Sequence, residues 1–154
     1  MEKPNIVQDI LKIVEEYNKA IFQIDPYMMT SEDIQLLIEE TKHPDLLTSE
    51  RCSHISLKIS QHIYGVQFRL NRVSALINYL NDEIMSIIAP DLIQYKGMSW
   101  THTENLAIKN NVAAEELHHI VRQYKLIKDS SFGQVDILKD IAKKIESIKY
   151  ERRV

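Results

Sequence analysis

Residues 49–88 read SERCSHISLKISQHIYGVQFRLNRVSALINYLNDEIMSII, and apolar side chains recur along this stretch at alternating steps of four and three residues. This spacing places them on one face of a continuous α-helix, which at about 1.5 Å per residue would be roughly 60 Å long. A sustained period of about 3.5 residues is typical of helices that supercoil around one another. The stretch therefore predicts one long, coiled-coil-like helix. Its apolar stripe is a candidate interface between copies of the chain and consists of Ile59, Ile63, Val66, Leu70, Val73, Ile77, Leu80, Ile84 and Ile87.

The rest of the chain has a helical pattern as well. Its 154 residues include only three Gly and four Pro, too few for the many tight turns of a β-sandwich or barrel. Thr48 or Ser49 is expected to cap the long helix, and Thr30 or Ser31 a short helix before it. The fold class is therefore all-α, and we expect an elongated helical bundle.

A helical hairpin is predicted at the C-terminal end. Thr101 and Glu104 have the spacing of a capping box, which marks the start of a helix. Residues 130–133, with two Ser and a Gly, are expected to break the chain before a last helix. The long helix and this hairpin would together form the C-terminal part of the molecule.

The charge divides the chain into two regions. Residues 1–50 contain eleven acidic and four basic side chains, whereas the remainder contains eleven acidic and fifteen basic ones. We therefore expect acidic N-terminal helices over residues 1–46, and the long helix plus hairpin over residues 47–154, within a single structural domain. The net charge of −3 is the small difference between these two parts.

Residues 51–81 contain no Asp or Glu at all. A local excess of positive charge suits a polyanion or an acidic protein partner, although a solvated helix face has the same composition. His54 and His62 lie in the same stretch and, eight residues apart, share a face of the helix. The candidate nucleic-acid-binding residues there and near the C-terminus are Lys58, Arg69, Arg72, Lys143, Lys144, Lys149, Arg152 and Arg153.

Aromatic side chains accompany these cations. Tyr64, Phe68 and Tyr79 lie near Arg69 and Arg72 on the predicted long helix. Aromatic rings at helical spacing are typical of a packed core. Exposed rings beside Arg and Lys would instead stack nucleic-acid bases while the cations follow the phosphates.

Catalytic and metal-binding motifs are absent. A single Cys excludes a disulfide framework, and no Gly-rich phosphate loop, G-x-S-x-G or H-E-x-x-H motif occurs. Residues 115–119 read EELHH and have Glu-x-x-His spacing, but a di-iron bundle needs a second such pair and further carboxylates. We expect no enzyme activity, no metal and no cofactor.

The N-terminus, MEKPNIVQDI, has no apolar signal core, and no stretch approaches about 18 uncharged apolar residues. A cytoplasmic protein without a membrane segment is therefore expected, in the host cytoplasm if the gene is carried by a phage.

The segment DLLTSERCSHISLKISQHIYGVQFRLNRVSALINYLNDEI resembles the UvsY family of small phage recombination-mediator proteins. Leu47-Thr48-Ser49-Glu50 matches the lead-in to the family's long helix. WTHTENLAIKNN matches the start of its hairpin, and KKIESIKYERRV matches the basic end of that hairpin. Residues 1–46 have no counterpart in the family pattern. The overall negative charge is a further departure, and it weakens the inference of DNA binding.

The resemblance implies a non-enzymatic homo-oligomer that binds single-stranded DNA, helps displace the single-strand-binding protein and helps load a recombinase. Under this hypothesis the basic residues named above contact the DNA. The alternative is a homo-oligomeric helical adaptor or inhibitor that binds a protein partner and has no nucleic-acid role.

Overall fold

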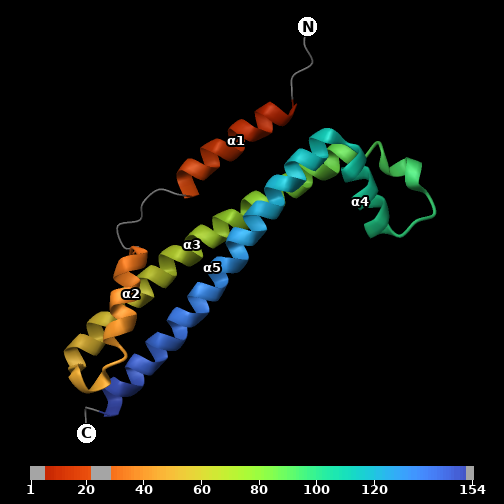
Figure 1. The fold of residues 1–154 in the computed structure, drawn as a ribbon. Coiled ribbons are helices and arrows are strands. Elements are labelled where there is room, and N and C mark those ends of the chain that lie inside the picture. The colour runs from red at the N-terminus through yellow and green to blue at the C-terminus, as the bar shows by residue number, and fades with distance from the viewer. Residues whose placement is uncertain (1–5, 22–28, 152–154) are drawn as a thin grey trace. The chain divides into compact units, whose positions relative to one another are not determined.

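The computed structural model describes residues 6–21 and 29–151, and these form helices joined by short connections (Figure 1). The α-helices are α1 (Ile6–Ile21), α2 (Ser31–Glu40), α3 (Ser49–Ile88), α4 (Trp100–Asn110) and α5 (Val112–Glu151). Two short 3₁₀ helices, η1 (Pro44–Leu46) and η2 (Leu92–Tyr95), precede α3 and α4. No strand occurs in these residues, so the all-α prediction is confirmed.

The chain forms two compact units, and both long helices contribute to each of them. Of the described residues, unit 1 contains 6–21 and 71–128, and unit 2 contains 29–70 and 129–151. Within each unit a segment of α3 lies beside a segment of α5 and runs antiparallel to it (Figure 1). The predicted division after residue 46 follows the charge of the chain, whereas these two units follow the packing of the helices.

Unit 1 has a core formed by α1, α4 and the adjoining parts of α3 and α5. Leu80, Ile88 and Leu117 are completely buried in it, and Ile10 and Val14 of α1 complete it. Burying a side chain of this size stabilises the fold by about 1.5–3 kcal/mol. Asn18 and Tyr124 form a hydrogen bond through their side chains, which connects α1 to α5.

Unit 2 has a separate core where α2 and η1 meet the first half of α3 and the last turns of α5. Ile55, Ile59 and Ile145 are buried at its centre, together with Leu47 and the thiol of Cys52. Burial of Cys52 among apolar side chains agrees with a structural thiol, because a reactive one needs an exposed electropositive setting.

The predicted starts of α2 and α3 are correct. The Thr30 hydroxyl accepts a hydrogen bond from the Asp33 amide, and the Asp33 carboxylate accepts one from the Thr30 amide, which completes a capping box. The Thr48 hydroxyl accepts from the Arg51 amide at 3.1 Å. These caps satisfy amides that have no partner inside their helices.

The apolar stripe of α3 is covered largely by other helices of the same chain. Six of its nine residues are buried, and Ile63, Val66 and Ile87 are half-buried. The buried face also departs from the predicted spacing, because His62 is buried where the pattern would place Ile63. The six buried stripe residues are Ile59, Leu70, Val73, Ile77, Leu80 and Ile84.

The predicted C-terminal hairpin is wrong, because α5 continues without a break through residues 130–133. Ser and Gly are weak helix formers, but only Pro removes a backbone hydrogen bond, and this segment has none. The capping box at Thr101 is also wrong: α4 begins one residue earlier, at Trp100, and Ser99 is its N-cap residue.

The continuity of α5 predicts that Gly133→Ala stabilises the protein. Gly133 lies inside the helix, and an added Cβ would meet no atom within 4 Å. The variant should raise the free energy of unfolding by about 0.5–1 kcal/mol, measured by urea denaturation. Gly97→Ala is the matched control and should lower it, because Gly97 has a φ of +95°. A loss of stability in Gly133→Ala would contradict the helical assignment at this position.

Candidate functional site

The part of α3 that belongs to unit 2 has an exposed aromatic stripe, which consists of Leu57, Tyr64 and Phe68 and is distinct from the predicted interface stripe. Leu57, Tyr64 and Phe68 are 58%, 73% and 49% exposed. Their spacings of seven and four residues place them on one side of the helix. Tyr64 and Phe68 are therefore not core residues, although aromatic rings at this spacing usually are. Tyr79 is half-buried and packs against the core of unit 1.

A row of basic residues lies next to this stripe. Lys58 is exposed and Arg69 is half-buried. The two residues are eleven positions apart, so they lie on the same side of α3, about 100° around the helix from the aromatic rings. Arg72 belongs to unit 1 instead, where its guanidinium donates to the carbonyl of Ala20 at 2.9 Å.

The basic residues of α5 do not form one continuous row. Lys143 is exposed and lies 3.7 Å from the carboxylate of Asp140. Lys144 is exposed and Lys149 is half-buried. The helical geometry separates Lys143 from Lys144 by about 100° and Lys144 from Lys149 by about 140°. Arg152 and Arg153 lie outside the described residues.

The acidic helix α2 lies against the same side of α3 as the basic row. Glu40 accepts two hydrogen bonds from the Arg51 guanidinium, at 2.6 and 2.7 Å. These bonds lower the pKa of Glu40 and raise that of Arg51. The pKa of Asp33 is lowered mainly by its hydrogen bonds with Thr30, and to a smaller extent by the charge of Lys58. The charge of Arg51 is thus neutralised within the chain, and Asp33 lies near Lys58 of the basic row.

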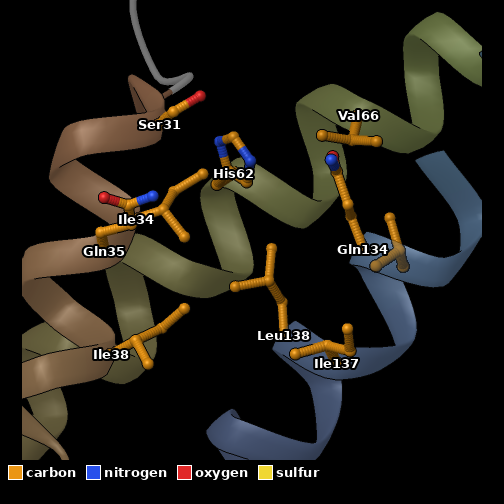
Figure 2. Close-up of a pocket in the computed structure, with 10 residues that line it drawn as sticks. Ser31, Ile34, Gln35, Ile38, His62, Val66, Gln134, Ile137 and Leu138 are labelled. Carbon is orange, nitrogen blue, oxygen red and sulfur yellow. The ribbon is translucent and has the colours of Figure 1, made fainter. Parts of the chain in front are cut away.

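A pocket of about 270 Å³ opens between α2, α3 and α5 within unit 2 (Figure 2). Figure 2 shows α2 on one side, α5 on the other, and His62 and Val66 of α3 between them. Its walls are mostly aliphatic, with amide and hydroxyl groups contributed by Gln and Ser side chains. The lining residues are Ser31, Ile34, Gln35, Ile38, His62, Val66, Gln134, Val135, Ile137 and Leu138.

His62 is the buried polar group of this pocket. The residue is only 5% exposed, and its Nδ1 accepts a hydrogen bond from the backbone amide of Met29 at 3.1 Å. Burial lowers the pKa of His62, and the positive charge of Arg69 lowers it further. The imidazole is therefore neutral at pH 7. His54, which the sequence places on the same face, is exposed.

No feature of the sequence pointed to this pocket. Ile34 and Gln134 come from helices that are far apart in the chain, and only the packing of unit 2 brings them to the same cavity. The apolar spacing of α3 also pointed to Ile63, and not to His62, as an inward-facing residue. The packing of α2 onto α3 was the missing information.

Two kinds of site receive no support from the part of the chain that the structure describes. No three His, Cys, Asp or Glu side chains in residues 6–21 and 29–151 come together to hold a metal ion, the EELHH segment included. Within the same residues, no helix has the length and apolarity required to cross a membrane.

The fold and these surfaces define an all-α protein with two helical units and an exposed aromatic stripe beside basic residues. Comparison with protein-family models, with curated proteins and with solved structures finds no match to this chain.

Proposed function

We propose that this protein is a non-enzymatic, single-stranded-DNA-binding accessory protein of the recombination-mediator class. The observation that carries the proposal is the exposure of Tyr64 and Phe68 on a stretch of α3 that contains no acidic residue. Large exposed aromatic groups cost free energy in water, and stacking with unpaired bases is one role that offsets this cost.

In this proposal the bases stack on Tyr64 and Phe68, and Lys58 and Arg69 contact the phosphates. Each site is small, so binding by one chain is weak. Assembly of several copies into a homo-oligomer would align several such sites along one strand and increase the total affinity.

The loading of a recombinase and the displacement of the single-strand-binding protein belong to the same proposal. They rest on the resemblance of residues 47–154 to the UvsY family. A cytoplasmic location follows from this function, because recombination takes place on DNA in the cytoplasm of the host cell.

Fluorescence anisotropy of a labelled oligo-dT strand tests the proposal. Binding should be saturable and should weaken steeply between low and moderate salt, because phosphate contacts release bound cations. Lys58→Glu should weaken binding at low salt by about tenfold, as expected when a phosphate contact is replaced by repulsion. Lys12→Glu in α1 is the charge-matched control and should have little effect. Absence of binding even at low salt would refute the DNA-binding function.

A protein-binding adaptor is the second candidate function, and the same stripe supports it. Leu57, Tyr64 and Phe68 have the spacing with which one helix anchors an amphipathic partner helix. The oligo-dT titration separates the two candidates, because an adaptor would not bind DNA in a salt-dependent way. The adaptor is favoured if the unmodified chain binds a purified protein partner but no DNA, and if Tyr64→Ala no longer binds that partner.

A further inference from the structure

The pocket of unit 2 has the features of a site for a small molecule. The side chains of Ile34 and Ile38 from α2 and of Ile137 and Leu138 from α5 form two apolar walls, and Val66 of α3 adds a further aliphatic group to the lining (Figure 2). Ligand pockets typically combine such walls with a few fixed polar groups. This pocket faces away from the aromatic stripe, since Tyr64 and Val66 are two residues apart and therefore about 160° apart around α3.

His62 supplies a fixed hydrogen-bond donor. Its Nδ1 accepts a hydrogen bond from the Met29 amide, so the neutral ring carries its own proton on Nε2. Nε2 makes no hydrogen bond within the described residues. Every fully buried polar side-chain atom in the same residues has a hydrogen-bond partner. Nε2 therefore keeps some exposure, although the residue as a whole is only 5% exposed, and His62 lines the pocket. A donor held in this way is positioned for an acceptor inside the pocket.

The pocket contains no charged side chain among its ten lining residues. An ionised ligand would lose its hydration without gaining a counter-charge, which is costly. An uncharged ligand with one acceptor atom would satisfy Nε2 and bury its apolar part against the isoleucines. Gln35 and Gln134 could bond to further polar atoms at the mouth.

We propose that this pocket binds a small uncharged molecule that has a compact apolar body and a hydrogen-bond acceptor, such as a ketone or amide oxygen, directed at Nε2 of His62. A volume of 270 Å³ corresponds to about nine water-sized volumes of roughly 30 Å³ each, which suits a ring with a short substituent. The pocket lies on the side of α3 opposite the aromatic rings of the proposed DNA-binding surface, whereas Arg69 lies on the same side of α3 as His62.

The test uses acetophenone as the probe and ethylbenzene, which has nearly the same shape but no oxygen, as its matched control. Both are titrated into the full ¹⁵N-labelled chain, and the backbone amide resonances of α2, α3 and α5 are followed by NMR. Acetophenone should produce saturable shifts around Ile34, His62 and Leu138, with an affinity about five to ten times that for ethylbenzene. Benzoate should bind more weakly than acetophenone.

Variants locate the site and identify the donor. His62→Phe keeps a ring but removes the donor, and it should abolish the preference for acetophenone. Val66→Phe should fill the cavity and remove binding of both probes, while His54→Phe, the control on the exposed surface of α3, should change neither affinity. The proposal is overturned if the unmodified chain shows no saturable shift at the pocket, if Val66→Phe binds as before, or if folded His62→Phe retains the preference.

Discussion

Replacement of both Tyr64 and Phe68 by alanine is expected to weaken the binding of oligo-dT about 30-fold or more. Base–aromatic stacking contributes about 1–3 kcal/mol per base, and two exposed rings on one side of α3 can each stack one base. The lower bound of about 2 kcal/mol for the pair corresponds to that 30-fold loss. Fluorescence anisotropy at low salt, where the unmodified chain binds most tightly, measures the change.

The stability of this double variant should remain close to that of the unmodified chain. Exposed side chains contribute little to folding, so the free energy of unfolding should change by less than about 1 kcal/mol. Tyr150→Ala is the matched control, because Tyr150 is 66% exposed on α5 and lies outside the stripe. Equal DNA affinity in the double variant and in Tyr150→Ala would remove the aromatic stripe from the proposed function.

Leu80→Ala is expected to lower the free energy of unfolding by about 3 kcal/mol. Leu80 is completely buried in the core of unit 1, which is formed by side chains of α1, α3, α4 and α5. Truncation of a buried leucine removes its transfer free energy and leaves a cavity, with a total cost of about 2–5 kcal/mol. Urea denaturation followed by circular dichroism measures the loss.

Leu57→Ala provides the matched comparison on the same helix. Leu57 is 58% exposed, so the same chemical change should cost less than about 0.5 kcal/mol. Similar losses for Leu57→Ala and Leu80→Ala would mean that the opposite sides of α3 are equally covered, for example by another copy of the chain. That result would contradict the exposure on which the DNA-binding proposal depends.

The course of α3 could be predicted from the sequence alone. Its ends at Ser49 and Ile88 agree with the prediction, because local chemistry determines both. Thr48 caps the first turn, and Pro90 disfavours helical geometry in the residue before it. The cap at Thr30 was predictable for the same reason.

The course of α5 could not be predicted in the same way. Residues 130–133 have weak helix propensity, and by local criteria they are a break between two helices. In the structure Val135 and Leu138 pack into unit 2 and Leu117 and Val121 pack into unit 1, and these contacts on both sides stabilise one continuous helix. Tertiary packing thus outweighs a propensity cost of about 1 kcal/mol.

For the candidate sites as well, some features depend on local sequence and others depend on tertiary packing. The sequence alone placed Tyr64, Phe68 and Tyr79 near Arg69 and Arg72 and identified eight basic residues as candidates for nucleic-acid binding, because composition and spacing are local properties. It favoured a core position for the rings, since spacing shows which residues share a side of a helix but not which side is covered. The exposure of Tyr64 and Phe68 is decided by the positions of α2 and α5 on α3.

The sequence by itself therefore determined the all-α class, the ends of α3 and the acid-free stretch of residues 51–81, because each depends on neighbouring residues. The tertiary structure alone decided that His62 is buried next to the half-buried Ile63, that Glu40 neutralises Arg51, and that α2 and α5 enclose a pocket. These features depend on which helix packs against each side of α3, and that is a property of contacts between residues far apart in the chain.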